Sequence, residues 1–496
     1  IAPSADVNWR PCFDNFTCTR LKVPLDYGDV SAGTVVLALL RISAAQQPAT
    51  NIIFNQGGPG GSSVDVLMAN AEEAQAAIGT SYNIIALDPR GVGHSEPNIE
   101  MFPGDPATAA NFESAFYRTV PDASSTALAS QYYFTEAFGK WFTRVLGGSR
   151  GTARYVSTPA AAQDMLTYVE AEQRAANKPE AEGKLWYYGI SYGTITGSVF
   201  AAKWPHRVGR MVLDGVDDPE GYFSGDWTKN LVDADAVVQS FAESCHRAGS
   251  KSCSFYRKTP ADIIKALDAV TEKIKWQPIP VFNESIANAP QLATYADLKR
   301  FLLQSLYRPV AFFPILDQVL TALEHDNGSP LLAAAAAVGQ LSLTSGSATA
   351  IQCIDSHGKG NMTLEEYNEV NNEIMDVSGY AGDAWSWNAI ICKNVEVQPP
   401  KSVTFGVIFV DLPPSAKLDF PILLISTKFD PVCPLRNAQK MAKYFPGSVV
   451  VTINAVGHSS FAAPSTCIVK HVAEYLGGKM PKKGIMCEAD IQPFDS

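Results

Sequence analysis

The stretch LWYYGISYGTITG, Leu185 to Gly197, decides the fold of this chain. Leu185 to Tyr188 favour a buried β-strand, and Thr194 to Trp204 are apolar and small, as in a buried helix that ends before Pro205. Ser191 stands between the two in the pattern G-x-S-x-G, whose glycines permit the sharp turn of a nucleophile elbow. Because this short pattern also arises by chance, an ordinary strand-to-helix turn with a surface serine is the alternative.

Strand-like and helix-like segments alternate on both sides of this stretch. Such alternation predicts an α/β fold with a mostly parallel central sheet and helices on both faces. From Asp217 the pattern changes to helices separated by prolines and loops, and the alternation later resumes. We therefore predict a core in two parts, residues 1–216 and 404–496, with a large helical cap inserted at 217–403. The expected strands are 34–41, 51–55, 83–88, 185–189, 211–214, 420–427 and 448–453, and the expected helices include 159–173, 230–249, 294–307, 364–377, 437–444 and 467–476.

A nucleophilic serine predicts two partners elsewhere in the chain. It needs a histidine base, and the base needs a carboxylate to orient it. In elbows of this kind the acid and then the histidine follow the serine. Of the seven histidines, His458 in AVGHSSF is on a glycine-flanked loop directly after a strand, and Asp430 in LLISTKFDPVCP follows the preceding strand. An Asp-Pro pair also forms ordinary turns. The predicted triad is Ser191, Asp430 and His458.

Acyl transfer also needs N–H donors for the developing oxyanion. The backbone N–H of Tyr192, directly after the serine, is one expected donor. The other is expected from Gly58 in IIFNQGGPGGSS, a glycine-rich loop after a strand. This loop is not followed by G-K-[ST], which argues against phosphate binding, and a plain tight loop is the alternative.

Composition and charge exclude several classes of protein. A chain of 496 residues with 46% hydrophobic content can bury a large core. With a net charge of −11 and no cluster of lysine and arginine, neither nucleic acid nor an anionic membrane is an expected partner. No stretch reaches the roughly 18 apolar residues of a membrane span. We expect no cofactor and, without a C-x-x-C pair, no structural metal; a monomer is the default expectation.

The cysteines and the glycosylation sequons point to a secreted glycoprotein. The nine cysteines fall mostly as neighbours, although spacing alone does not fix their connectivity. The expected disulfides are Cys12–Cys18, Cys245–Cys253, Cys353–Cys392 and Cys467–Cys487, with Cys433 left over, and the sequons are at Asn15, Asn283, Asn327 and Asn361. The chain starts at Ile1, which suggests either a removed leader or a trimmed chain. Secretion would allow both modifications.

Several of these motifs, taken in order, resemble one family. NQGGPGG, ALDPRGVGHS, GISYGT, the DGV at Asp214 and the late DPVCP and GH resemble secreted α/β-hydrolases of the tripeptidyl-aminopeptidase-like family, relatives of the prolyl aminopeptidases. The resemblance covers most of the chain, with the cap least constrained. It implies an α/β-hydrolase fold in which Ser191 is the nucleophile, His458 the general base and then acid, and Asp430 the orienting residue. It also implies that Gly58 and Tyr192 provide the oxyanion donors.

The chain departs from the pattern of this family at two positions. Gln56 precedes the two glycines where the prolyl branch commonly has histidine, which weakens a strict prolyl-aminopeptidase assignment. Cys433 stands where family members often have threonine, and we expect its thiol to be a small buried filler. Asp88 and Arg90, in ALDPRGVGHS, are expected to brace core loops rather than to contact substrate.

An aminopeptidase must also hold the ammonium group of its substrate. A carboxylate in a partly desolvated pocket does this best. Asp217, Asp218 and Glu220 at the start of the cap are candidates, together with Asp355 in AIQCIDSHG, which looks like an acidic residue in a similar segment of the family. The alternative for all four is a solvated surface carboxylate.

These inferences lead to three functional hypotheses. The first is a secreted serine exopeptidase that acylates Ser191 with a short N-terminal peptide, releases the shortened chain and deacylates with water. The second is a secreted carboxylesterase acting on small esters, because the same residues also hydrolyse esters. The third is a catalytically silent binding protein, which the presence of all three triad residues disfavours.

Overall fold

One large β-sheet organises the α/β part of the chain. The computed structural model describes residues 1–117, 119–147, 151–282, 289–338, 346–356, 359–401 and 417–495. The strands of the sheet are β1 (Arg10–Cys12), β2 (Phe16–Pro24), β3 (Thr34–Ile42), β4 (Asn51–Asn55), β5 (Asn83–Leu87), β6 (Leu185–Ile190), β7 (Val208–Asp214), β10 (Leu423–Phe429), β11 (Val449–Val456) and β12 (Met486–Glu488). Their spatial order is β1-β2-β3-β5-β4-β6-β7-β10-β11-β12. Pairs from β5 to β12 are parallel and the three earlier pairs antiparallel, so the sheet is mostly parallel, as expected.

Helices cover both faces of this sheet. They are α1 (Ser63–Ala69), α2 (Ala71–Ile78), α5 (Thr158–Ala175), α6 (Tyr192–Lys203), α16 (Leu435–Tyr444) and α17 (Thr466–Leu476). Because successive strand side chains point to opposite faces, Ile53 and Tyr187 pack with α5, α6 and α16, while their neighbours Ile52 and Tyr188 pack with α1, α2 and α17. Two apolar clusters therefore hold the sheet between two helical layers, which confirms the predicted architecture.

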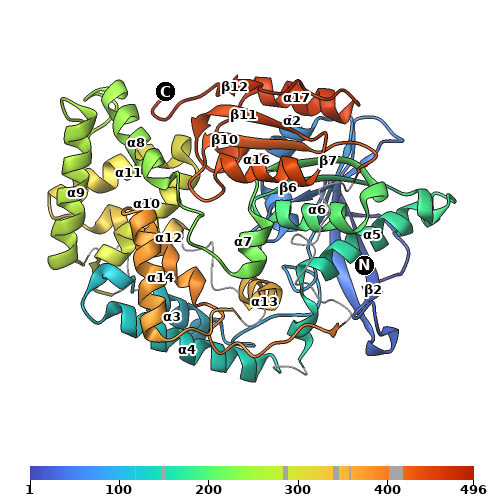
Figure 1. Cartoon of the computed structure of the whole chain (residues 1–496), viewed down its shortest axis with the longest axis horizontal. Helices are drawn as coiled ribbons and strands as arrows, with labels where there is room; N and C mark the ends of the chain where they lie inside the picture. The colour runs from blue at the N-terminus through green and yellow to red at the C-terminus, as the bar shows by residue number, and fades with distance from the viewer. Residues whose placement is uncertain are drawn as a thin grey trace.

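A helical cap packs beside the core and has its own apolar cluster, which includes Phe241, Leu302 and Phe313. Its elements are α7 (Pro219–Ser224), α8 (Ala234–Ala248), α9 (Pro260–Trp276), a small hairpin of β8 (Ile279–Val281) and β9 (Gln291–Ala293), α10 (Tyr295–Tyr307), α11 (Pro309–Glu324), α12 (Ser329–Val338), α13 (Gly346–Asp355), α14 (Leu364–Val377) and α15 (Gly382–Trp385). In Figure 1 the helices α8 to α12 form the left side of the molecule and the sheet lies on the right.

Two further helices, α3 (Pro106–Tyr117) and α4 (Ala127–Val145), come from between β5 and α5 and lie near α14 at the bottom of Figure 1. The hydroxyl of Tyr132 in α4 donates to the carbonyl of Met362 at 2.9 Å, and the hydroxyl of Tyr367 in α14 donates to the side chain of Gln131. A second segment, α3 and α4, thus packs on the cap, although it comes from residues 1–216, which we expected to belong to the core alone. We retain 217–403 as the proposed main insertion.

The cysteines pair as the sequence suggests. Disulfides join Cys12–Cys18, Cys245–Cys253, Cys353–Cys392 and Cys467–Cys487, while Cys433 is free and buried. Three sequons, at Asn15, Asn327 and Asn361, are exposed, and Asn283 lies outside the described residues. Among the helices that the structure describes, none combines the length and apolar character that crossing a bilayer requires.

Candidate active site

Ser191 occupies a strained turn between β6 and α6. Its backbone has φ +56° and ψ −126°, a left-handed conformation that non-glycine residues rarely adopt. The Ser191 N–H donates to the carbonyl of Asp214 at 3.0 Å, and the Ser191 carbonyl accepts from Thr194 N at 2.8 Å. Gly57 packs against the turn so closely that a Cβ there would lie 2.4 Å from the Ile190 carbonyl oxygen. The surrounding contacts therefore hold the serine at the apex of an elbow, as predicted.

Asp430 and His458 meet at the ends of two neighbouring parallel strands. Asp430 follows β10 and His458 follows β11, and the His458 Nδ1 lies 2.9 Å from an Asp430 carboxylate oxygen. The Asp430 side chain is fully buried and also accepts hydrogen bonds from three backbone N–H groups, those of Val432, Cys433 and Ser459. With Nδ1 donating to Asp430, Nε2 is the acceptor nitrogen, and it has no hydrogen-bond partner among the described residues. This arrangement leaves Nε2 available to take a proton from a serine.

Negative charge around His458 favours its protonated form. Burial lowers the pKa of His458, but the charge of Asp430, the hydrogen bond to Asp430 and the charges of Asp214 and Asp217 outweigh it, so the pKa is raised overall. The ring also packs edge-on to Tyr307, with centroids 5.2 Å apart, and the His458 N–H donates to the Tyr307 carbonyl at 2.9 Å. The imidazole is thus held from both the core and the cap.

Cys433 belongs to this site, which the sequence did not indicate. Its thiol interacts with the side chain of Ser191, and burial raises its pKa well above the usual value. One ligand atom each from Asp430, Cys433 and His458 lies within 4.8 Å of the others, a spacing that a metal ion could bridge. The Asp430 carboxylate, however, is already saturated by His458 and three backbone N–H groups, and the Cys433 thiol is protonated, so these donors suit a catalytic triad better than a metal centre. In the second such cluster, Cys467, His471 and Cys487, both cysteines are tied up in a disulfide.

The glycine-rich loop approaches the elbow from the other side. A Cβ on Gly57 would lie 3.1 Å from the Tyr192 backbone nitrogen, so this loop and the first turn of α6 face the same space. Gly58, the next residue, has φ +118°, which favours glycine. Gly60 in turn packs against Ala348 of α13. The expected donors Gly58 and Tyr192 therefore belong to segments in direct contact.

The four candidate carboxylates have different surroundings. Asp355 is buried, where its carboxylate accepts from Thr158 N at 2.9 Å, from the Thr158 hydroxyl and from the Tyr222 hydroxyl at 3.0 Å. Thr158 also hydrogen-bonds the hydroxyl of Tyr192, so this network holds the first residue of α6. Asp355 is buried and already accepts three hydrogen bonds from Thr158 and Tyr222, which leaves it poorly placed to receive a substrate ammonium.

Asp218 and Glu220 are both paired with a lysine. Lys440 of α16 lies 2.8 Å from the carboxylate of Asp218 and 2.6 Å from that of Glu220. Tyr444 donates a further hydrogen bond to Glu220. These groups connect the start of the cap to α16, and the charge of Lys440 offsets one of the two negative charges.

Asp217 is different, because its negative charge reaches the catalytic groups. Its backbone N–H donates to the Thr194 hydroxyl at 3.0 Å, and its carboxylate accepts from Asp218 N at 2.8 Å. Burial, with added repulsion from Asp218 and Asp430, raises its pKa to about 7. Asp217 lines a pocket of about 630 Å³ between α7 and α16, together with Tyr222 and Trp227. Asp217 would offer its negative charge to a cation in this pocket, and the same charge acts on His458.

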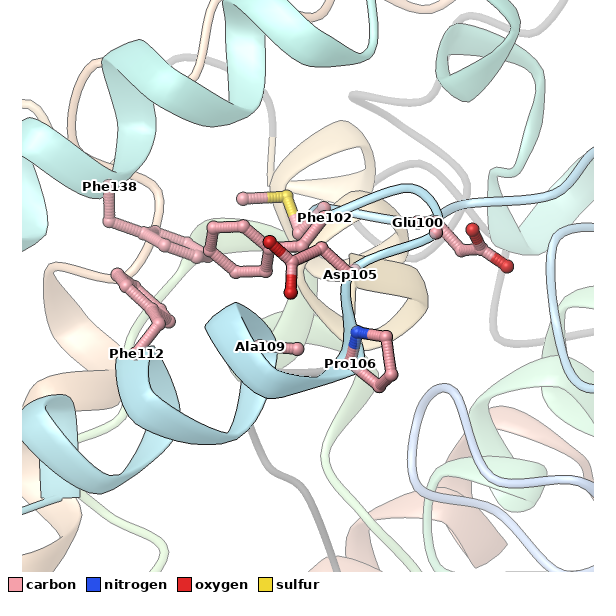
Figure 2. Close-up of a pocket in the computed structure, with 10 residues that line it drawn as sticks. Glu100, Phe102, Asp105, Pro106, Ala109, Phe112 and Phe138 are labelled. Atoms are coloured by element: carbon pink, nitrogen blue, oxygen red, sulfur yellow. The ribbon is translucent and has the colours of Figure 1, made fainter.

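Figure 2 shows a second pocket, of about 400 Å³, between the segment before α3, α4 and the start of α13. The rings of Phe102, Phe112 and Phe138 gather in it, and the carboxylates of Glu100 and Asp105 are nearby. Ser191, Asp430 and His458 line neither this pocket nor the one at Asp217. Asp88 and Arg90 are in neither pocket: Asp88 accepts from Ser62 and Val64 at the start of α1, and Arg90 pairs with buried Asp164, so both brace the core as expected.

Comparison with known proteins agrees with this geometry. The α/β hydrolase fold family matches residues 50–244, which include the elbow, and the TAP-like protein family matches residues 378–487, which include Asp430 and His458. The chain is therefore an α/β-hydrolase with a TAP-like region at residues 378–487. Its fold class and its enzymatic nature, predicted from the motifs, are thereby confirmed.

Three curated relatives align with this chain over nearly its whole length. Serine protease Hip1 of Mycobacterium tuberculosis is 24% identical and covers 97% of this chain and 91% of that protein. Tripeptidyl aminopeptidase of Streptomyces lividans is 25% identical, covering 99% and 88%. Carboxylesterase B of M. tuberculosis is 22% identical, covering 95% and 86%. This chain is therefore a serine hydrolase whose relatives include both peptidases and a carboxylesterase.

Proposed function

We propose that this protein is a secreted serine exopeptidase that removes short peptides or residues from free N-termini. In this proposal Ser191 is the nucleophile, His458 takes its proton through Nε2, and Asp430 fixes the tautomer through Nδ1. The backbone N–H groups of Gly58 and Tyr192 stabilise the oxyanion. The acyl-enzyme is a short peptide on Ser191, and water, activated by the same histidine, releases it.

One observation carries the choice of an N-terminal substrate. Asp217, Asp218 and Glu220 all line the pocket between α7 and α16, but Asp218 and Glu220 are paired with Lys440. Asp217 acts on His458 and has no lysine or arginine among the groups that shift its pKa. A substrate ammonium would supply the missing positive charge and lower the pKa of Asp217, so that binding and ionisation assist each other. Tyr222 and Trp227 would give the substrate residues apolar contact.

The test compares two neighbouring variants on two substrates. A chromogenic tripeptide amide with a free amino terminus and its N-acetylated form are assayed with Asp217→Asn and with the matched control Asp218→Asn, whose carboxylate is paired with Lys440. We expect Asp217→Asn to raise KM for the free amine by about tenfold to a hundredfold, the range of a lost charged hydrogen bond. Asp218→Asn should leave this KM unchanged. Ser191→Ala is the blank. Equal effects of both variants, or equal cleavage of both substrates, would refute the N-terminal assignment.

A carboxylesterase is the second candidate, because carboxylesterase B aligns over 95% of this chain and the triad chemistry does not distinguish amides from esters. If the protein is a carboxylesterase, it should hydrolyse short acyl esters rapidly, and Asp217→Asn should leave that rate unchanged. Its cleavage of the free tripeptide amide should be negligible.

Secretion is also part of the proposal. Four disulfides support it, because such bonds persist in oxidising compartments, and the exposed sequons at Asn15, Asn327 and Asn361 are accessible to glycosylation. Recovery of the disulfide-bonded protein from culture medium of the native cells would support secretion. Its confinement to the reduced cytosolic fraction would exclude it.

A further inference from the structure

Asp214, the last residue of β7, is a buried carboxylate that the mechanism above does not use. Its side chain is fully inaccessible to solvent. Among the described residues, the groups that donate hydrogen bonds to it are neutral, namely Ser460 N at 2.8 Å, the Ser460 hydroxyl and the Tyr188 hydroxyl at 2.9 Å. Burying a carboxylate without a cation is costly, so such a residue calls for a specific reason.

The partners of Asp214 belong to the two segments that carry the nucleophile and the base. Its main-chain carbonyl accepts the Ser191 N–H at 3.0 Å, and Tyr188 lies on β6, the strand that leads into the elbow. Ser460 is two residues after His458. Through its carbonyl and its carboxylate, Asp214 therefore connects the elbow to the histidine loop.

The residue after Asp214 continues this contact. Gly215 has φ +63°, and a Cβ placed on it would lie 3.2 Å from the His458 Cε1 and 3.0 Å from the Ser459 Cβ. The end of β7 thus packs tightly against the imidazole ring, so that a Cβ at position 215 would require a neighbour to shift. The end of β7 is therefore one of the contacts that fix His458 relative to Ser191, besides Asp430 and Tyr307.

We propose that Asp214 is a positioning residue that sets the distance between Ser191 and His458 and, as a second carboxylate besides Asp430, stabilises the imidazolium formed when His458 takes the serine proton. The inference rests on the proposed roles of Ser191 and His458. Asp430 acts on Nδ1 by direct contact, whereas Asp214 acts through the Ser460 loop and through its charge. Removing the charge of Asp214 should therefore change the proton affinity of His458 as well as its position.

The other groups around His458 define what else contributes to its titration. These are Asp430 and Cys433 on the loop after β10, Asp217 at the start of the cap and the ring of Tyr307 at the end of α10. Among the charges that raise the pKa of His458, that of Asp214 ranks after Asp430 and before Asp217. None of these other groups is altered by a substitution at position 214, so their contribution stays constant in the comparison.

The experiment uses two substitutions in the network and one outside it. Asp214→Asn keeps the size of the side chain and removes its charge, and Ser460→Ala removes a hydroxyl of the same network without changing charge. Asp88→Asn is the matched control, because Asp88 is also fully buried and bonded to neutral donors, but at the start of α1. The readouts are kcat and the pH dependence of kcat/KM for an N-acetylated ester, together with Tm.

We expect Asp214→Asn to lower kcat by about tenfold to a hundredfold, the effect of a small misplacement of a catalytic group, and to move the acid limb of the profile to lower pH. Ser460→Ala should lower kcat with its acid limb unchanged, and Asp88→Asn should lower Tm only. An Asp214→Asn profile that superimposes on the wild-type profile, with a fall in Tm like that of Asp88→Asn, would overturn the inference. If His458→Ala retains full activity, the proposed function itself is wrong. If His458→Ala is inactive but the Asp214→Asn profile is unchanged, only the proposed role of Asp214 is wrong.

Discussion

The carboxylate of Asp430 lies 2.9 Å from Nδ1 of His458, although 28 residues separate the two in the chain. Parallel pairing of β10 with β11 brings their carboxyl ends together, and ligand and catalytic groups of α/β proteins gather at that edge. The contact fixes which ring nitrogen carries the proton, and thereby which nitrogen faces the serine.

The first prediction follows from that tautomer. Asp430→Asn should lower kcat by about 10³- to 10⁴-fold, because an amide can donate to Nδ1 and favour the wrong tautomer. KM for a short ester should change little. Steady-state kinetics checks this, with circular dichroism to confirm folding. A loss of less than tenfold in the folded variant would show that Asp430 does not orient His458.

A second prediction concerns pH. Deprotonated His458 is the base, so activity on any substrate should fall as pH drops through its pKa, which lies above the usual 6.5. Free-amine substrates carry an extra dependence, because Asp217, with a pKa of about 7, must be ionised to bind ammonium. The ratio of kcat/KM for free over N-acetylated peptide should therefore rise from pH 5 to about 7 and fall again above about 8, where α-amino groups lose their proton. A ratio independent of pH would contradict the role of Asp217.

The buried Asp355 gives a prediction about stability. Burial raises its pKa from 3.8 to about 7, so the folded state binds its proton more tightly than the unfolded state. The contribution of Asp355 to the free energy of unfolding is fully present below about pH 4 and is lost as the pH rises towards about 7. Asp355→Asn, which keeps a carbonyl acceptor towards Thr158 and cannot ionise, should flatten the dependence of Tm on pH across that window. Parallel curves of Tm against pH for the variant and the wild type would show that Asp355 does not titrate in this window.

Two glycines provide a matched test of the elbow. Gly57 and Gly33 both have φ near +100°, but a Cβ on Gly57 would collide with the Ile190 carbonyl, whereas a Cβ on Gly33 would have no atom within 4 Å. Gly33→Ala should therefore cost about 1–3 kcal/mol of backbone strain and spare kcat. Gly57→Ala should in addition displace the elbow and lower kcat by about a hundredfold. If both variants show the same kcat, close packing of Gly57 does not position Ser191.

Local patterns were sufficient to predict the features that depend on neighbours in sequence. The bounds of β4 and α14 match the expected segments residue for residue, and α6 begins directly after Ser191. The order of serine, acid and histidine followed from strand topology, because each residue is on a loop after a parallel strand. The disulfides join nearby cysteines, so spacing alone suggested them.

Features that depend on distant contacts were not accessible in this way. Asp217, Asp218 and Glu220 look alike in sequence, and only the position of Lys440, more than 200 residues later, separates them. The same holds for Cys433, whose contact with Ser191 results from the fold, and for α4, which packs on the cap although it precedes the elbow. The DGV motif drew attention to Asp214 at the end of a strand, but the motif does not indicate that Asp214 bonds to Ser460.

The most direct test of the central claim is covalent labelling with a fluorophosphonate, mapped by peptide mass spectrometry in the wild type, His458→Ala and Asp430→Asn. The account predicts stoichiometric modification of Ser191 in the wild type and labelling slowed by at least about a hundredfold in both variants, since the serine hydroxyl depends on the oriented base. Absence of label on Ser191 in the folded wild type, or equal labelling rates in all three proteins, would contradict it.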